Sequence, residues 1–186
     1  MSIKKNLAAT VFVALGFGAL GAYFGLDKKP QPPVSPAAQP AATPAAAGPV
    51  QTLFAQTLPD AAGKQQALAQ WRGKALLVNF WAPWCAPCVQ EMPELSALQQ
   101  EFAGKALQII GVGIDSPGNI AQFAAKFKIA YPLYVAGMGG TDLMRLFDNS
   151  AGSLPYTVLI GADGQIKKTY LGRLQFERLR ADLKSM

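Results

Sequence analysis

Hydrophobic residues are distributed very unevenly along the chain, with one long apolar run near the amino terminus. The run LAATVFVALGFGALGAYFGL covers residues 7–26 and contains no charged side chain. A helix rises about 1.5 Å per residue, so a run of this length spans roughly 30 Å, the thickness of the hydrocarbon core of a bilayer. The pattern therefore predicts an amino-terminal transmembrane anchor over residues 1–27.

A cleaved signal sequence is the alternative interpretation of the same run. Ala19-Leu20-Gly21 resembles a cleavage site, but the run is longer than the apolar region of about 7–15 residues that signal peptides usually carry. Lys4 and Lys5 precede the run, which weakly favours a cytoplasmic amino terminus. Both interpretations place the rest of the chain outside the cytoplasm.

Residues 28–50 have a different composition, KKPQPPVSPAAQPAATPAAAGPV, with seven prolines and almost no large apolar side chains. Proline interrupts helices, and a segment with so little apolar surface cannot bury enough of it to fold. We expect a semi-extended linker with polyproline II character that holds the following domain away from the membrane.

Residues 51–186 show the alternating strand and helix patterns of a single α/β domain. Short continuous apolar runs indicate buried strands, and apolar residues three or four positions apart indicate helices. Thr141 is the predicted N-cap of the third helix, and Asp163-Gly164 is the predicted hairpin turn. The predicted order is strand, helix, strand, helix, strand, helix, hairpin and helix, over residues 75–82, 85–102, 106–114, 117–127, 131–135, 141–147, 156–171 and 175–183. This order predicts parallel strands first and an antiparallel edge last.

The composition excludes several kinds of chemistry. The chain has no histidine, which rules out a Ser-His-Asp or Cys-His pair and any histidine-ligated metal. Two cysteines cannot form a four-thiolate metal site. Half of the net charge of +6 comes from residues 1–50, so the domain itself is too weakly basic to indicate nucleic-acid binding.

Both cysteines lie in the string Trp84-Cys85-Ala86-Pro87-Cys88, between the first predicted strand and the first predicted helix. The positive end of a helix stabilises a thiolate, which is the attacking species in thiol–disulfide exchange. We expect Cys85, near the exposed N-cap, to attack a substrate disulfide, and Cys88, further inside, to resolve the mixed disulfide. Pro87 is compatible with the first turn of a helix.

Three other interpretations of the cysteine pair are weaker. Half of a zinc site lacks a second pair of ligands. A purely structural disulfide would close too short a loop to add much stability. Two buried and inert thiols would be unusual at a helix amino terminus. A redox function is therefore preferred.

The segment VNFWAPWCAPC, with Pro93 five residues after the second cysteine, resembles the thioredoxin superfamily. Residues 54–74 and Gln90-Glu91-Met92-Pro93 resemble its membrane-anchored, extracytoplasmic branch, the TlpA/ResA-type and CcmG-type thiol–disulfide oxidoreductases. The resemblance covers residues 54–186 and implies a thioredoxin fold, a central mixed sheet flanked by helices. It also implies a helix–strand insertion, which the hydrophobic pattern puts at residues 117–135.

The resemblance also implies roles for residues around the cysteines. Leu154 and Pro155 match the family's cis-proline loop, which lies against the cysteine motif and pairs with the substrate backbone. The alternative is an ordinary trans proline before an edge strand. Substrate contacts are expected from Leu154 and Pro155 and from the motif residues Trp84, Ala86 and Pro87. Trp84 is expected to cover the thiols, and Trp81 to belong to the core.

Glu91 matches the acidic residue that ResA-type proteins hold near the thiols, where it would accept or donate a proton. The alternative is a solvated carboxylate on the helix surface. Asn79 occupies the position where cytoplasmic thioredoxins carry a buried aspartate. Glu91 is therefore the remaining candidate for proton transfer near the cysteines.

Taken with its motifs, the resemblance implies a single-pass protein of the bacterial cytoplasmic membrane whose catalytic domain faces the extracytoplasmic side. It would be monomeric, use no cofactor or metal beyond its own cysteine pair, and reduce specific protein disulfides. Clients would belong to cytochrome c maturation or metal-centre assembly, and electrons would come from a transmembrane donor of the DsbD/CcdA type.

Three alternatives to this function stay open. A DsbA-type oxidase or isomerase favours histidine between its cysteines, which Ala86-Pro87 does not supply. A non-catalytic binding module would be expected to lose a cysteine or the proline of the loop, and neither is lost. A peroxidase would need a threonine and an arginine around the cysteine, a pattern that the sequence lacks.

Overall fold

A computed structural model describes residues 48–104 and 107–185. The predicted anchor, residues 1–27, and nearly all of the predicted linker, residues 28–50, lie outside the described residues. Among the helices of the described part, none is long and apolar enough to cross a membrane.

The folded part begins earlier than the sequence predicted. Helix α2 (Pro49–Ala55) has proline in its first turn and buries Val50, Leu53 and Phe54. The predicted linker therefore ends before residue 50, because proline is tolerated at the start of a helix even though it breaks the interior of one.

A small hairpin and a short helical turn follow α2, and neither was predicted. Strand β1 (Thr57–Pro59) pairs antiparallel with β2 (Gln65–Ala67), and the 3₁₀ turn η1 (Leu68–Trp71) comes directly after. The Leu68 N–H donates to the Gln56 carbonyl at 3.0 Å and so ties the turn to the end of α2.

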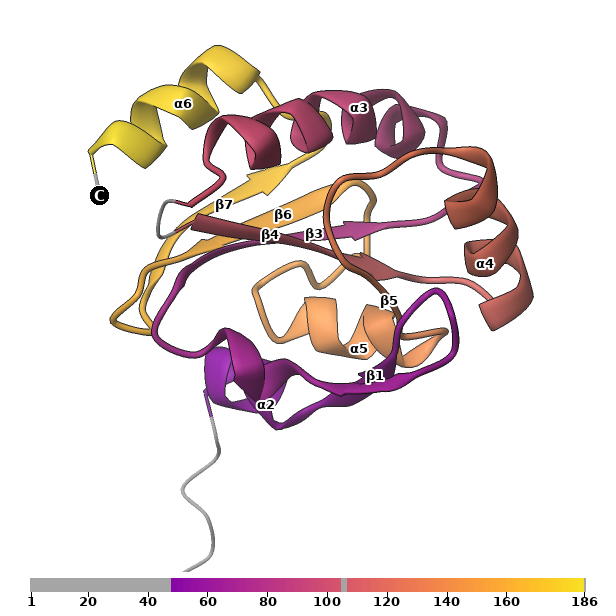
Figure 1. Ribbon diagram of the computed structural model, residues 1–186. Helices are drawn as coiled ribbons and strands as arrows, with labels where there is room; N and C mark the ends of the chain where they lie inside the picture. Colours follow the sequence, from indigo (N-terminus) through magenta and orange to yellow (C-terminus); the bar gives the residue numbers. More distant parts are fainter. Residues whose placement is uncertain (1–47, 105–106, 186) are drawn as a thin grey trace, which may run out of the picture. The chain divides into compact units, whose positions relative to one another are not determined.

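The central sheet has five strands in the order β5-β4-β3-β6-β7, which confirms a mixed thioredoxin-like sheet (Figure 1). Strand β3 pairs in parallel with β4, and β4 in parallel with β5, whereas β6 is antiparallel to both β3 and β7. The strands are Ala75–Trp81 (β3), Leu107–Gly113 (β4), Leu133–Val135 (β5), Tyr156–Ile160 (β6) and Ile166–Leu171 (β7).

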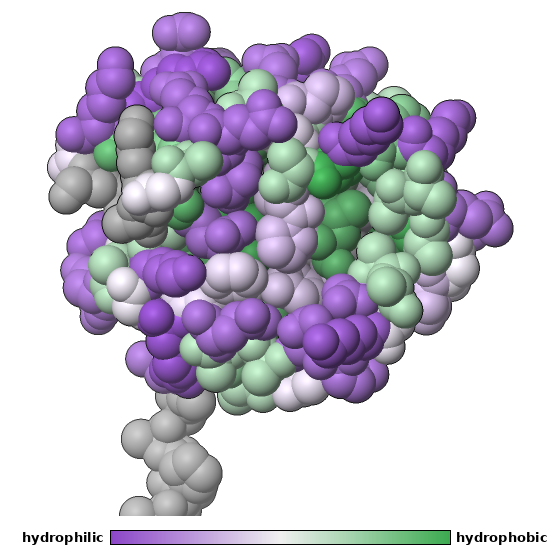
Figure 2. Space-filling view, viewed as in Figure 1, coloured by the Kyte–Doolittle hydropathy of each residue, from purple (hydrophilic) through white to green (hydrophobic). Residues whose placement is uncertain are grey.

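Helices cover both faces of this sheet (Figure 1). Helices α3 (Ala86–Glu101), α4 (Pro117–Lys126) and α6 (Phe176–Lys184) contribute to one hydrophobic cluster, and α2 and α5 (Gly139–Arg145) contribute to the other. Helix α4 and strand β5 lie within residues 117–135, where the resemblance implied a helix–strand insertion. In Figure 2 hydrophilic residues cover the upper surface, over α6 and α3.

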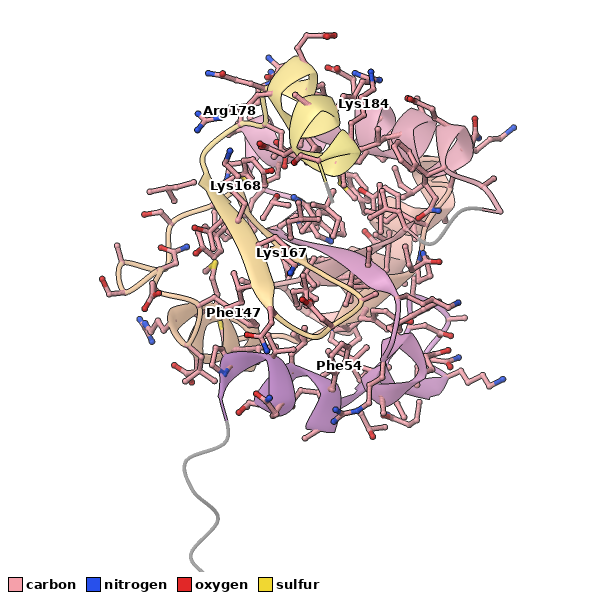
Figure 3. The ribbon with its side chains drawn as sticks, turned by 90° about the vertical axis from the view of Figure 1, so that its left-hand side faces the viewer. Phe54, Phe147, Lys167, Lys168, Arg178 and Lys184 are labelled. Atoms are coloured by element: carbon pink, nitrogen blue, oxygen red, sulfur yellow. A yellow bond between two sulfur atoms is a disulfide. The ribbon has the colours of Figure 1, made fainter. Side chains whose placement is uncertain are left out.

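Helix α6 is attached to the edge strand β7 by side chains that meet around one carboxylate. Lys168 Nζ lies 2.8 Å from Asp182 Oδ1, and the Tyr170 hydroxyl donates to Asp182 Oδ2 at 2.8 Å. Figure 3 shows Lys168 on β7 and Arg178 and Lys184 on α6 at this end of the molecule. The attachment holds the β7–α6 connection in place, and that connection reaches the site described below.

Thr141 does not cap α5, contrary to the prediction. The helix begins at Gly139 with Met138 at the N-cap, and the Thr141 N–H donates to the Met138 carbonyl at 3.0 Å. Gly137, at φ 54°, adopts a left-handed conformation that glycine accepts without strain, so the chain turns into the helix before Thr141 is reached.

Candidate active site

The two cysteines lie at the junction between the central strand and α3, and they form a disulfide. Cys85 is the N-cap residue of α3, its Cα lies 5.3 Å from that of Cys88, and its sulfur accepts the Cys88 N–H at 3.3 Å. The predicted arrangement of strand, cysteine motif and helix is confirmed. A backbone N–H directed at the Cys85 sulfur also favours the thiolate form of that residue.

The two cysteines differ in their access to solvent. Cys88 is completely buried, whereas Cys85 retains 6% of its surface. Ala86 and Pro87 between them are exposed. A substrate can therefore approach the pair only from the Cys85 side, which agrees with Cys85 as the attacking residue.

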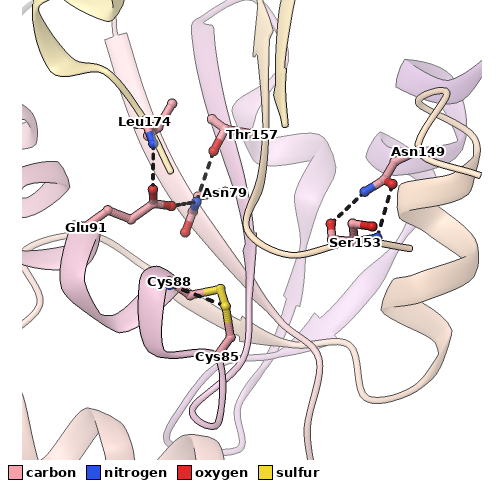
Figure 4. The surroundings of a disulfide bond; sticks show 8 residues. All are labelled: Asn79, Cys85, Cys88, Glu91, Asn149, Ser153, Thr157 and Leu174. Carbon is pink, nitrogen blue, oxygen red and sulfur yellow. Dashed lines mark hydrogen bonds between the residues drawn. A yellow bond between two sulfur atoms is a disulfide. The ribbon is translucent and has the colours of Figure 1, made fainter. Parts of the chain in front are cut away.

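Glu91 lies one helical turn beyond Cys88 and is fully buried. Its Oε1 accepts a hydrogen bond from Asn79 Nδ2 at 2.8 Å, and its Oε2 accepts one from the Leu174 N–H at 3.0 Å (Figure 4). A solvated carboxylate on the helix surface, the alternative left open by the sequence, is therefore wrong.

Burial controls the acidity of this carboxyl. Removal from water raises the pKa of Glu91 above its ordinary value, because the charged form loses hydration. The hydrogen bonds from the Leu174 N–H and Asn79, together with the charge of Arg173, act in the opposite direction without cancelling the effect. A buried carboxyl with a raised pKa is well suited to take up and release a proton.

Asn79 connects this carboxylate to a third segment of the chain. Its Nδ2 also donates to the Thr157 hydroxyl at 3.0 Å, and Asn79 and Thr157 are both fully buried (Figure 4). Asn79 was singled out from the sequence only because it stands where cytoplasmic thioredoxins carry an aspartate. Thr157 and Leu174 were not identified from the sequence. The asparagine inside the apolar run ALLVNFWA could have indicated a buried hydrogen-bond partner for Asn79, because a buried polar side chain is costly without one.

The loop before β6 brings Leu154, one of the predicted substrate-contacting residues, to the same groove as Trp84, whereas Pro155 is buried. The peptide bond between Leu154 and Pro155 is cis, as the resemblance implied. A groove of about 490 Å³ runs beside the motif, and both Trp84 and Leu154 line it together with Met138. Trp81 is completely buried, as predicted. Trp84 is 69% exposed.

Within residues 48–104 and 107–185, no three histidine, cysteine, aspartate or glutamate side chains gather as a metal site would require. The reactive groups that the site brings together are the two sulfurs and the Glu91 carboxyl.

Comparison with known families assigns the chain. The family model described as Redoxin matches residues 36–183. The chain belongs to the Redoxin family. Among relatives, the thiol-disulfide oxidoreductase ResA of Geobacillus thermodenitrificans is 31% identical over 130 residues, covering 69% of this chain and 72% of the relative. The thioredoxin-like protein YneN of Bacillus subtilis is 29% identical over 131 residues, covering 68% and 74%.

Solved structures agree with this assignment. A putative thioredoxin from Neisseria meningitidis is 30% identical, with a TM-score of 0.60 over 70% of this chain and 85% of that one. A putative thiol:disulfide interchange protein DsbE from Chlorobium tepidum, at 23% identity, has a TM-score of 0.62 over 70% and 91%, and supports the fold. With its cysteine pair at the helix terminus, this Redoxin-family chain is a protein thiol–disulfide oxidoreductase.

Proposed function

We propose that the protein is a membrane-anchored reductant of specific protein disulfides on the extracytoplasmic side of the bacterial cytoplasmic membrane. The observation that carries the redox part of the proposal is the graded burial along α3: Cys85 with 6% of its surface exposed, Cys88 completely buried, and the buried Glu91 one turn further on. This order matches the three roles that reduction of a disulfide requires.

The first step is attack on the substrate. The Cys85 thiolate attacks one sulfur of the substrate disulfide, which breaks that bond, forms a mixed disulfide with Cys85 and releases the first substrate thiolate. Trp84 and Leu154, with the exposed Ala86 and Pro87, form the surface on which the substrate chain lies during this step, and the buried Pro155 follows Leu154 in the same loop.

The second step regenerates the disulfide of the enzyme. Cys88 gives its proton to the Glu91 carboxylate, and the resulting thiolate attacks the Cys85 sulfur and expels the second substrate thiolate. Two electrons have then passed from the cysteine pair to the substrate, whose thiolates take up protons from solvent. Renewed reduction of the pair requires an electron donor, for which we propose a transmembrane thiol carrier of the DsbD/CcdA type.

The reduction potential of the Cys85–Cys88 pair tests the proposed direction. Ala86-Pro87 offers no histidine to stabilise a thiolate, which favours a reducing couple, and we expect a value near that of thioredoxin, about −270 mV. A value near the oxidising end, about −120 mV, would instead support a DsbA-type oxidase and overturn the proposal.

Client trapping tests the order of the two cysteines. We expect Cys88→Ala to accumulate covalent complexes with clients, because the mixed disulfide can no longer be resolved. The proposed clients are proteins of cytochrome c maturation or metal-centre assembly, identified by the partner that is released when the complexes are reduced. Trapping by Cys85→Ala in place of Cys88→Ala would reverse the assignment of the attacking thiol.

The location of the domain is tested separately from the chemistry. Proteolysis of intact spheroplasts should remove the domain from the membrane fraction if it faces the extracytoplasmic side. Protection of the domain until the cells are lysed would contradict the proposed location and leave the redox assignment intact.

A further inference from the structure

One atom of the buried network has no partner. The Asn79 Nδ2 group makes two hydrogen bonds, to Glu91 at 2.8 Å and to Thr157 at 3.0 Å. Asn79 Oδ1, in contrast, accepts no hydrogen bond from any residue that the structure describes, although the side chain is completely buried. Buried polar atoms are nearly always hydrogen-bonded, so an exception at a functional site requires an explanation.

The orientation of the Asn79 amide is set by Glu91. If the amide were turned over, its carbonyl oxygen would face a carboxylate oxygen, and two acceptors would oppose each other. Nδ2 therefore faces Glu91, and in Figure 4 the Oδ1 end of the amide points toward the Cys85–Cys88 disulfide.

The packing around Asn79 agrees with this direction. Leu77 and Trp81, two positions before and after it on β3, belong to the same hydrophobic cluster as Cys88. Alternate residues of a strand share a face, so Asn79 lies on the face against which Cys88 is packed.

The disulfide has no hydrogen to donate to this oxygen, whereas its reduced form does. Two electrons and two protons convert the disulfide into two thiols, and each thiol can donate a hydrogen bond from its S–H. The Cys88 thiol forms in a site with no exposure to solvent. On the basis of the proposed function, we propose that Asn79 is a positioning residue whose Oδ1 accepts a hydrogen bond from the Cys88 thiol in the reduced enzyme.

This bond exists in one redox state only. It stabilises the dithiol relative to the disulfide and keeps Cys88 protonated until a mixed disulfide has formed at Cys85. The same amide holds the Glu91 carboxylate through its nitrogen, so Asn79 orients the proton donor and the proton acceptor of the second step together. When Cys88 transfers its proton and attacks Cys85, Oδ1 is released.

The test is the exchange equilibrium of the full chain with reduced and oxidised glutathione. Asn79→Leu removes the acceptor and keeps the branched arrangement of heavy atoms. We expect it to shift the equilibrium toward the disulfide by about three- to tenfold, the range of one modest net hydrogen bond. A tenfold shift corresponds to about 30 mV. Thr157→Val is the matched control, because it removes the other partner of Nδ2 and leaves Oδ1 unchanged, so the equilibrium should not move.

A second comparison separates the thiol bond from the charge of Glu91. Asn79→Leu is also measured in a Glu91→Gln background, where no carboxylate is present. A shift of the same size in both backgrounds supports the bond to Cys88. An unshifted equilibrium in Asn79→Leu would overturn the bond, because a merely structural role destabilises both redox states equally. A shift that disappears in the Glu91→Gln background would also overturn it, because the shift would then come from the Glu91 charge.

Failure of the variant to fold does not prevent the test. In the wild-type chain, the side-chain carbonyl carbon of Asn79 should give an NMR signal downfield of its position in Cys88→Ala under the same reductant. Identical positions would overturn the bond. If the wild-type pair does not exchange with glutathione at all, the proposed function fails and this inference with it, an outcome distinct from loss of the Asn79 effect alone.

Discussion

At the scale of single residues, Glu91 makes the clearest prediction about pH. Its folded-state pKa is raised above the ordinary value of 4.5, so the folded protein holds this proton more tightly than the unfolded chain. The contribution of this proton to the unfolding free energy is fully present below about pH 4.5, and it is lost as the pH rises through the folded-state pKa of Glu91. The unfolding free energy of the wild type, relative to that of Glu91→Gln, should therefore fall as the pH rises from 4.5, as measured by urea denaturation.

Gln90→Ala is the control for this measurement. Gln90 lies on the same helix, is exposed and carries no titratable group. The difference in unfolding free energy between Gln90→Ala and the wild type should not change over the same pH range. A pH-independent difference between the wild type and Glu91→Gln would show that burial does not perturb Glu91.

Trp84 allows a prediction that separates binding from stability. Its side chain is 69% exposed, so Trp84→Ala should change the unfolding free energy by less than about 0.5 kcal/mol. Its place in the groove beside the disulfide predicts a loss of about tenfold in kcat/KM for a protein disulfide, because exposed aromatic residues often dominate contacts with partners.

Leu171→Ala is the matched control for Trp84→Ala, because Leu171 is 68% exposed but lies on the edge strand β7. It should leave both stability and activity unchanged. Equal activity of the Trp84→Ala variant and the wild type would remove Trp84 from the substrate-binding surface.

The residues that the sequence identified are those whose role is carried by local spacing. Cys85 and Cys88 share one helix turn, whereas the role of Pro155 was implied only by the resemblance to the thioredoxin superfamily. The surroundings of Glu91 could not be predicted in this way. Leu174, whose N–H donates to Glu91, lies 83 positions further along the chain. Thr157, which accepts the second hydrogen bond of Asn79, lies 78 positions after Asn79. Only the folded sheet brings these segments together.

At the scale of elements, length and periodicity separate what was predicted from what was not. Strands β3 and β4 and helices α3 and α4 were predicted because each has a sustained apolar pattern. Strands β1 and β2, with three residues each, have too few positions to show a period. Tertiary contacts support this region, such as the hydrogen bond from Trp71 Nε1 to the Tyr134 hydroxyl at 3.0 Å.

The close contact of β4 with its neighbours gives a prediction for Gly111. A Cβ atom there would lie 2.6 Å from Leu133 Cδ2 and 3.0 Å from Trp81 Nε1. Since Leu133 and Trp81 are themselves buried, Gly111→Ala should lower the unfolding free energy by about 1–3 kcal/mol, as measured by denaturant unfolding.

Gly118 provides the comparison for Gly111. It lies in the first turn of α4, and a Cβ atom there would meet nothing within 4 Å. Gly118→Ala should leave stability unchanged or raise it by up to about 1 kcal/mol, because alanine is the better helix former. Equal effects of the two substitutions would contradict the tight packing at Gly111.

At the scale of the whole molecule, the site depends on the central position of β3. Strand β3 lies between β4 and β6. The cysteine motif that follows β3, the loop before β6 and the β7–α6 connection therefore converge at one end of the sheet. The predicted order of elements indicated parallel strands first and an antiparallel edge last, and the central mixed sheet was implied by the resemblance; the place of β3 between β4 and β6 comes from the structure. The amino-terminal boundary was not predictable, because Pro49 reads as part of a proline-rich linker until the partners of α2 are known.

That boundary leads to a prediction about truncation. Residues 46–186 form a compact unit of their own. A chain that begins at Ala46 should therefore unfold in one cooperative transition and reduce a soluble protein disulfide with the same kcat/KM as the full chain. A chain that begins at Gln56 lacks Val50, Leu53 and Phe54, each of which is at most 5% exposed. Since burial of one such side chain contributes about 1.5–3 kcal/mol, the shorter chain should lose several kcal/mol. Equal stability of the two truncated chains would show that α2 (Pro49–Ala55) does not belong to the folded domain, whose boundary would then lie after α2.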